Sequence, residues 1–239
     1  IEENDLLELL DKIKISSKDI NCIGISGGKT KDFPNEIDEI RIIQVPEVEA
    51  IGRGAKKNFE IEDSFLAMSL GTGTGCIFGD KDNNYQYIGG IPVGGGTLIG
   101  LSKLLLNETN IESISKLANA GDRSVVDFLI KDVVSGINIL KPNLSASNFA
   151  KVSEGIHRKE DISKALTNMI GEIIGTVAFS NALIFQKEEI YFIGRTFLEP
   201  NVKSAIDERL AIAGISGIYS SSLGFENCLG ILDFIKENY

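Results

Sequence analysis

Apolar residues recur along the chain with two different spacings, which together predict a protein of mixed α and β structure. Short apolar runs bounded by glycine or polar residues are typical of buried strands, and they cover residues 21–28, 40–45, 64–70, 189–197 and 217–221. Apolar positions three and four residues apart are typical of helices, and they cover residues 2–13, 47–59, 93–106, 110–119, 123–134, 160–186, 201–213 and 224–237. Strands that alternate with helices indicate an α/β fold.

The first glycine cluster is GTGTG at residues 71–75, which directly follows the apolar run at 64–70. The segments CIFGD and YQYIGG come next and flank the turn KDNN at residues 81–84, a pattern that predicts a β-hairpin. Rossmann and P-loop sites need a helix directly after the glycine loop. Because a strand follows GTGTG here, the sequence excludes both kinds of site.

A second glycine cluster, GGG at residues 94–96, opens the apolar helix expected up to residue 106. The first N–H groups of a helix have no partner within the helix, so they can face an anion. A hairpin that folds back would bring residues 71–75 close to this helix start, and N–H groups from both clusters could then face one polyphosphate. Glycine suits these positions because a Cβ would hold the backbone away from the phosphate oxygens. An ordinary glycine-rich hairpin turn explains GTGTG alone equally well.

A third glycine turn ends the apolar run in the segment FIGRTF, at Gly194. We expect the base or the sugar of a nucleotide to lie near this turn. The hydroxyl groups of Thr72, Thr74 and Thr97 can add donors at the two glycine clusters. Three strand ends with such turns indicate a nucleotide-binding protein.

The composition of the chain narrows the range of partners. With 24 Lys and Arg against 34 Asp and Glu, the net charge of −10 argues against nucleic-acid binding. Cys22, Cys76 and Cys228 form no CxxC pair, which fits a reducing cytoplasm and three buried, small apolar side chains. The one histidine, His157, has no second histidine or cysteine nearby, so we assign no residue as a metal ligand. With no apolar run of membrane-spanning length and no visible signal peptide, we expect a cytoplasmic protein without a membrane partner.

Several blocks of the sequence, in this order, resemble the type II (eukaryotic-like) pantothenate kinases: SLGTGTG, YIGGIPVGGGTLIGLSKLLL, ISKLANAGDRSVVDFLIKDV, SASNFA, YFIGRTF and GFENCLGIL. The resemblance extends from about residue 21 to the end, and GGGTLIGL, LANAGDRSVVD and ASNFA are its most specific pieces. It implies membership of the acetate kinase/sugar kinase/Hsp70/actin superfamily, with two ribonuclease-H-like lobes around a central cleft. We therefore expect residues 1–63 to be the remainder of an incomplete N-terminal lobe, and residues 64–239 to be the C-terminal lobe with dimerisation helices.

The resemblance also implies the chemistry: phosphorylation of pantothenate by Mg²⁺-ATP, the first step towards coenzyme A, in a homodimer that can take an acyl-CoA as a feedback ligand. It assigns nucleotide binding to Gly71, Thr72, Gly73, Thr74, Gly75, Gly94, Gly95, Gly96, Thr97 and Gly194. The segment PEVEAIGRG resembles a stretch that places Glu47 near the phosphoryl acceptor, where a carboxylate can accept the hydroxyl proton or hold Mg²⁺ through water. An acidic residue that only stabilises a helix N-terminus is the alternative for Glu47.

Three departures from the family pattern leave the acceptor open. The family begins with a DxGG strand–turn that cradles phosphate, and this chain, which opens on Ile1, does not show it. Gly75 stands where the family has a serine, and Tyr87 stands where an arginine pairs with the pantothenate carboxylate; we expect both to line the substrate site. The alternatives are a related kinase with a different small hydroxylated acceptor, and a non-catalytic homologue that binds a nucleotide or coenzyme A for regulation. Arg53, Arg123 and Arg195 are other cations that could bind the carboxylate.

Overall fold

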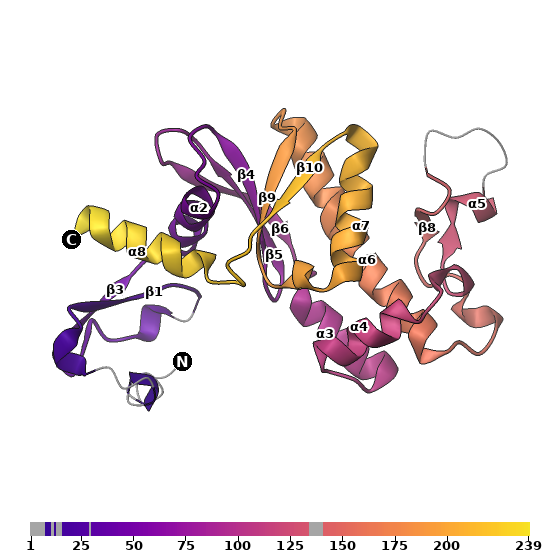
Figure 1. Ribbon diagram of the computed structural model, residues 1–239, viewed down its shortest axis with the longest axis horizontal. Helices are drawn as coiled ribbons and strands as arrows, with labels where there is room; N and C mark the ends of the chain where they lie inside the picture. The colour runs from indigo at the N-terminus through magenta and orange to yellow at the C-terminus, as the bar shows by residue number, and fades with distance from the viewer. Residues whose placement is uncertain (1–7, 11, 13–15, 29, 134–140) are drawn as a thin grey trace.

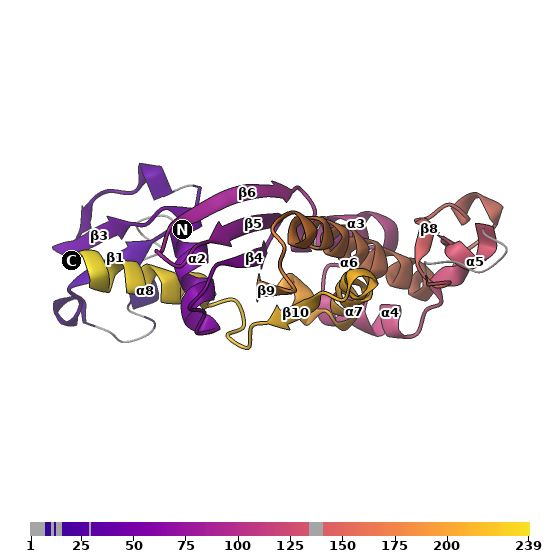
Figure 2. The ribbon, with the colours of Figure 1, turned by 90° about the horizontal axis from the view of Figure 1, so that it is seen from above.

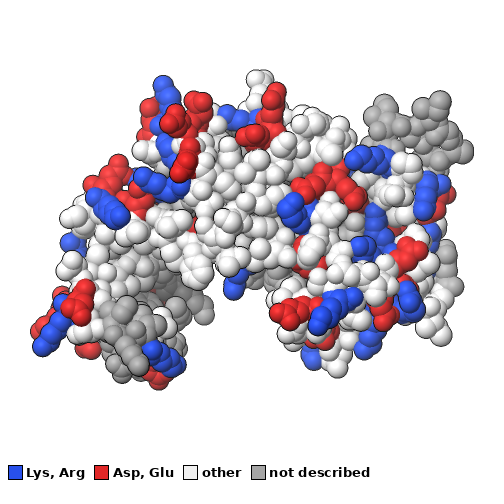
Figure 3. Space-filling view, in the orientation of Figure 1, with Lys and Arg blue, Asp and Glu red and all other residues white. Residues whose placement is uncertain are grey.

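The molecule is elongated, with a central sheet and smaller units at either end (Figures 1 and 2). The computed structural model describes residues 8–10, 12, 16–28, 30–133 and 141–239. The helix expected at 2–13 therefore lies mostly outside the described residues. On the face shown in Figure 3, acidic and basic side chains are interspersed towards the two ends, and the area over the central sheet is largely uncharged. None of the helices in the described ranges combines the length and apolar character that a membrane crossing requires.

The central sheet has five strands in the order β10-β9-β4-β5-β6. Their bounds are β4 (Phe65–Leu70), β5 (Thr74–Gly79), β6 (Tyr85–Ile91), β9 (Glu189–Gly194) and β10 (Ser216–Tyr219). Strands β4, β5 and β6 form an antiparallel meander, whose β5–β6 hairpin the KDNN turn predicted, while β9 pairs parallel to β4 and β10 pairs parallel to β9. Three antiparallel strands extended by two parallel ones form a ribonuclease-H-like lobe, as the resemblance implied.

Strand β4 is buried on both of its faces, which explains its uninterrupted apolar sequence. On one face, Leu66 and Met68 belong to a core with Ile170 of the long helix α6 (Lys159–Ile184). On the other face, Phe65 and neighbouring apolar residues pack against Ile51 of helix α2 (Glu47–Asn58). Further helices surround α6: α3 (Gly95–Leu106), α4 (Ile111–Asn119) and α7 (Pro200–Leu210).

A smaller sheet lies at the opposite end of the molecule from α5 (Ile130–Val133) and β8 (Ser145–Ser147) (Figure 1). It consists of β1 (Cys22–Ile25), parallel to β3 (Ile40–Gln44), and β2 (Glu36–Ile37), antiparallel to β3. Helix α2 and the last helix, α8 (Glu226–Asn238), pack closely on each other beside it. Their approach requires glycine, since a Cβ on Gly54 or on Gly230 would lie 2.2 and 2.0 Å, respectively, from a carbonyl oxygen of the other helix. The division of the chain after residue 63 stays a prediction.

The prediction of one helix over residues 123–134 is wrong. The segment forms a short 3₁₀ helix (Arg123–Val125), strand β7 (Phe128–Leu129) and the single-turn helix α5 (Ile130–Val133), and β7 pairs with β8 (Ser145–Ser147) in what was expected to be a loop. The physical reason is Asp127, a fully buried carboxylate that accepts the N–H of Phe149 at 2.8 Å and a guanidinium hydrogen bond from Arg123 at 3.3 Å. These tertiary partners outweigh local helix propensity.

Glu172 on α6 is the centre of a buried polar network next to β8. Its carboxylate accepts the N–H of Ser145 at 3.1 Å and lies 3.4 Å from the guanidinium of Arg209. Burial alone would raise the pKa of Glu172, but these hydrogen bonds and the two nearby guanidinium groups, of Arg209 and Arg123, lower it below its ordinary value. The folded state therefore favours the ionised carboxylate.

We predict that Glu172→Gln lowers the free energy of unfolding by about 3 kcal/mol, because it leaves buried cations without their counter-charge. Urea denaturation at neutral pH measures this loss, with Glu188→Gln, an exposed position, as the control. Because the folded pKa is lowered, the ionised form stabilises the fold above pH ~4.3, and this contribution disappears as the pH falls. The gap between wild type and variant should then narrow in acid; an unchanged gap would contradict the assignment.

Candidate active site

Two cavities meet at the turn after β4. One, of about 830 Å³, lies between α3, α4 and the segment 195–200, and Gly71 and Thr72 form part of its wall. The other, of about 510 Å³, lies between the first turn of α2 and strands β4, β5 and β6, and it is lined by the same two residues. A molecule in either cavity therefore reaches this turn from its own side.

Hydrogen bonds fasten this turn to the start of α3. Gly95 donates its N–H to the carbonyl of Gly71 at 2.8 Å, and Gly96 donates to the carbonyl of Thr72 at 3.0 Å. A Cβ on Gly94 would lie 2.8–2.9 Å from the carbonyl oxygens of residues 71, 72 and 73, so only glycine fits there. The two glycine clusters are thus adjacent, as expected.

The N–H groups available to a ligand differ from those expected. Those of Gly95 and Gly96 are used within the protein, so they hold the turn instead of facing an anion. The N–H groups of Thr72 and Gly73, by contrast, donate to no acceptor in the described part of the protein. The turn itself, more than the helix start, offers donors to a phosphate oxygen.

The threonine hydroxyls divide in a similar way. Thr74 donates to the carbonyl of Val93 at 2.8 Å and Thr97 to that of Pro92 at 3.1 Å, so both stabilise the backbone. Thr196, which the sequence did not suggest, donates to the carbonyl of Gly71 at 3.0 Å. The Thr72 hydroxyl makes no hydrogen bond with the described residues. Of the three threonines predicted to donate to a ligand, it alone is therefore available at the shared turn.

Gly194 brings the ends of the parallel strands β4 and β9 together. It has a φ of +98°, and a Cβ there would lie 2.4 Å from the Leu70 carbonyl oxygen. The next residue, Arg195, donates its N–H to that same carbonyl at 3.0 Å and lines the larger cavity. Ligands of α/β sheets bind at such carboxyl ends of strands.

Part of the wall of the larger cavity is apolar. Ile99, Ile111 and Leu198 line it and keep between 41% and 46% of their surface exposed. At its edge, the buried carboxylate of Glu199 accepts the Ser115 hydroxyl at 3.0 Å, which fixes α4 to the start of α7. Sequence reasoning missed these wall residues, because their spacing on α3 and α4 is also that of ordinary core positions.

The smaller cavity is lined by an acidic and a phenolic side chain. Glu47, the first residue of α2, is exposed and lines it, as does Tyr87 of β6, which is 55% exposed. A Cβ on Gly75 would lie 3.4 Å from the Tyr87 ring, an ordinary contact, so space does not require glycine there. No Lys, Arg or His is found among the described residues that line this cavity.

The sequence comparisons identify the family. The Fumble family matches residues 55–211 of the chain. The chain is 33% identical to the type II pantothenate kinase of Bacillus cereus over 199 residues, which covers 79% of this chain and 71% of that protein. The chain belongs to the Fumble family, that of the type II pantothenate kinases. It is also 35% identical to pantothenate kinase 1 of Arabidopsis thaliana over 154 residues, 59% of this chain and 40% of that protein.

Solved structures confirm the fold. The activator of the 2-hydroxyisocaproyl-CoA dehydratase from Clostridium difficile, with bound ADPNP, superimposes with a TM-score of 0.59 at 15% identity, over 98% of this chain and 83% of that one. A ROK family glucokinase from Streptomyces griseus, in complex with glucose and AMPPNP, superimposes with a TM-score of 0.52 at 14% identity, over 84% of this chain and 70% of that one. This pantothenate kinase homologue therefore has the actin-like ATPase and sugar-kinase fold.

The cations considered for the acceptor carboxylate lie elsewhere in this family member. Arg53 is bound by carboxylates on α2 and α8, and Arg123 is bound in the network around Asp127. Arg195 faces the larger cavity. Of the cysteines, Cys76 is buried, which raises the pKa of its thiol to about 12, whereas Cys22 is only half-buried and Cys228 is exposed, contrary to expectation.

We predict that Gly94→Ala weakens ATP binding by tenfold or more, roughly 1.4 kcal/mol, because its Cβ would push the turn away from α3. Isothermal titration calorimetry with ATP measures the dissociation constant. Gly100→Ala is the matched control, since a Cβ at this position of the same helix meets nothing within 4 Å. Equal ATP affinity in the two variants would show that the packing at Gly94 does not shape the nucleotide site.

Proposed function

We propose that the protein transfers the γ-phosphoryl group of ATP to the 4′-hydroxyl of pantothenate, the first step of coenzyme A biosynthesis. The observation that carries this proposal is the turn at Gly71 and Thr72, shared by the two cavities. In-line phosphoryl transfer requires donor and acceptor to approach one point from opposite sides. Membership of the type II pantothenate kinase family supports the same reaction.

In this proposal, the larger cavity holds ATP. The N–H groups of Thr72 and Gly73 donate to phosphate oxygens, which can approach because the turn carries little side-chain bulk. The partly exposed Ile99, Ile111 and Leu198 cover the faces of the base, a contact that removes their apolar surface from water.

The smaller cavity holds the acceptor, with Glu47 as the catalytic carboxylate. Glu47 is the one acidic side chain among the described residues of its wall, and it can accept the hydroxyl proton. Mg²⁺ is usually bound by one or two carboxylates together with substrate phosphates, so Glu47 and the nucleotide phosphates fit a Mg²⁺ that neutralises charge during transfer. A carboxylate whose only role is to stabilise the start of α2 is the alternative.

The remaining parts of the proposal concern location and assembly. We place the enzyme in the cytoplasm as a homodimer, with an acyl-CoA as a feedback ligand and no nucleic-acid or membrane partner. The net charge of −10 supports the absence of a nucleic-acid partner. Exposed apolar side chains on α3 and α6, such as Leu104 and Ile184, support a dimer formed by helices of the C-terminal lobe.

One observation favours a related acceptor as the second candidate. Pantothenate carries a carboxylate, and no cation in the described chain lines the acceptor cavity, where Tyr87 stands in place of the family's arginine. A different small alcohol would then be the substrate. ATP binding without turnover of any alcohol would instead indicate a regulatory homologue.

We predict that Glu47→Gln lowers kcat with pantothenate by about 10²-fold or more, the usual effect of a lost general base, and leaves the dissociation constant of ATP unchanged. A coupled ADP-release assay measures turnover, and Glu36→Gln, exposed on β2, is the control. If Glu47→Gln turns over at the wild-type rate, Glu47 only stabilises the helix start.

We predict that Tyr87→Arg lowers KM for pantothenate by about tenfold, because a guanidinium–carboxylate pair contributes about 1.5 kcal/mol or more. An uncharged pantothenate amide should gain nothing, and Tyr87→Phe, which removes only the hydroxyl, should not reproduce the gain. An unchanged KM for pantothenate in Tyr87→Arg would show that the carboxylate does not lie near position 87.

A further inference from the structure

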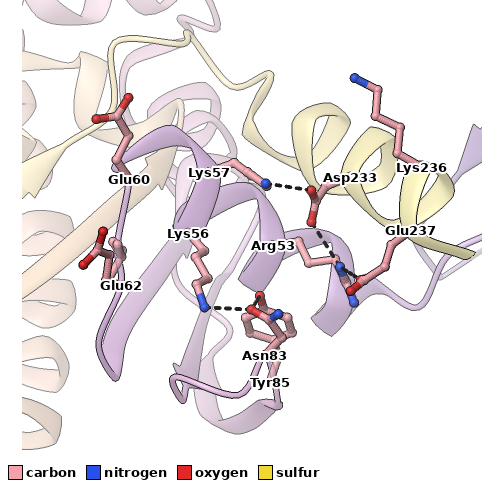
Figure 4. A pocket seen from close by; sticks show the side chains of 11 residues that line it. Arg53, Lys56, Lys57, Glu60, Glu62, Asn83, Tyr85, Asp233, Lys236 and Glu237 are labelled. Atoms are coloured by element: carbon pink, nitrogen blue, oxygen red, sulfur yellow. Dashed lines mark hydrogen bonds and ion pairs between the residues drawn. The ribbon is translucent and has the colours of Figure 1, made fainter.

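A pocket lined by charged side chains lies on the side of α2 that faces α8 and the β5–β6 turn. Its volume is about 690 Å³, and its wall comes from the C-terminal halves of α2 and α8, from residues 60–62, and from Asn83 and Tyr85 (Figure 4). The cavity proposed for the acceptor does not share a residue with it. Arg53 of α2 forms part of this wall, although only 8% of its surface is exposed.

Arg53 binds three carboxylates from two helices. Its Nε lies 2.8 Å from Glu49 on α2, and its Nη1 lies 3.0 Å from Asp233 and 2.5 Å from Glu237 on α8. The guanidinium carbon is also 5.5 Å from the centre of the Phe234 ring. Burial alone would lower the pKa of Arg53, but the three carboxylates raise it above its ordinary value, so the group stays charged.

Arg53 and Glu47 lie on the same helix, α2, but on different parts of its surface. The two residues are six positions apart, which is about 9 Å along a helix axis. Glu49 follows Glu47 by two positions, so the two side chains point about 200° apart around the helix. Arg53 holds Glu49 on the α8 side, while Glu47, on the other side of the helix, lines the acceptor cavity.

The N-terminal end of α8 contacts the Gly194 turn, which lies beside the cavity proposed for ATP. Its first residue, Glu226, is buried and accepts the N–H of Gly194 at 3.4 Å and that of Gly224 at 3.4 Å. Helix α8 is therefore anchored at the Gly194 turn at its start and at Arg53 near its end. The close glycine contacts between α2 and α8 leave little room for the helices to slide.

We propose that Arg53 is a positioning residue for phosphoryl transfer: by joining Glu49 of α2 to Asp233 and Glu237 of α8, it fixes the direction in which α2 presents Glu47 to the acceptor. The inference rests on the proposed function, in which Glu47 is the catalytic carboxylate. Removal of the guanidinium leaves three carboxylates close together, which repel one another and separate α2 from α8.

The kinetic test uses Arg53→Lys and Asp233→Asn, since each keeps part of the contact and is milder than loss of the whole side chain. At saturating ATP, kcat should fall by about 10- to 100-fold, as small misplacements of a catalytic group do, while KM for ATP changes less than twofold. Lys57→Ala is the matched control: Lys57 also binds Asp233, at 3.0 Å, but is 60% exposed and touches no second carboxylate among the described residues.

A double-mutant comparison separates positioning from stability. If Arg53 acts through Glu47, Arg53→Lys should cause little further loss of kcat in the Glu47→Gln background. A full further loss there, or an unchanged kcat in both single variants, would overturn the inference.

Hydrogen–deuterium exchange tests the same inference without turnover. Amides in the first half of α2 should exchange faster in Arg53→Lys and Asp233→Asn than in wild type or Lys57→Ala. Equal exchange in all four proteins would overturn the inference. Absence of pantothenate turnover in wild type would instead contradict the proposed function, and the exchange data would still decide whether Arg53 fixes α2.

Discussion

The contact between the turn after β4 and the first turn of α3 holds both cavities in place. It consists of two backbone hydrogen bonds, from Gly95 and Gly96 to the carbonyls of Gly71 and Thr72. The backbones approach so closely that a Cβ on Gly94 would collide with the carbonyl oxygens of the turn. Because the turn is fixed in this way, the walls contributed by α3 and by α2 face a common point. A side chain at residue 94 would separate them, and the two cavities would no longer share a wall.

Burial of β4 on both faces gives this contact a rigid base. The strand packs against α6 on one side and α2 on the other, so both helices are positioned relative to the turn at its end. The apolar sequence FLAMSL predicted this burial directly, since a strand covered on both faces needs apolar residues at every position. The β5–β6 hairpin could be anticipated from the KDNN turn, whereas the order β10-β9-β4-β5-β6 depends on which strands pair, and the apolar pattern does not show that.

Other features depended on contacts between residues far apart in the chain, so the sequence could not indicate them. The segment 123–134 has helical spacing, yet Asp127 is buried among partners such as the Phe149 N–H, and strand β7 forms instead. The sequence predicted that the two glycine clusters lie close together. It could not predict that the N–H groups of Gly95 and Gly96 donate to the turn, because this depends on the direction of the carbonyls of the turn. The apolar wall at Ile99 and Ile111 resembles core spacing, because a helix face that meets a ligand has the same pattern as one that meets protein.

The half-exposed ring of Tyr87 is a native fluorophore in the wall of the cavity proposed for the acceptor. The chain has five tyrosines and no tryptophan, so tyrosine emission is not hidden beneath a stronger fluorophore. Tyr219 is largely enclosed by its stacking on Phe192, and Tyr191 contacts Phe59 and Phe65, whereas Tyr87 stands in the wall of the cavity. Filling that cavity changes the surroundings of Tyr87, whereas Tyr239, the other strongly exposed tyrosine, lies against Arg41 and is not among the described residues of that wall. The contribution of Tyr87 to the emission therefore reports occupancy of the cavity proposed for the acceptor without a label.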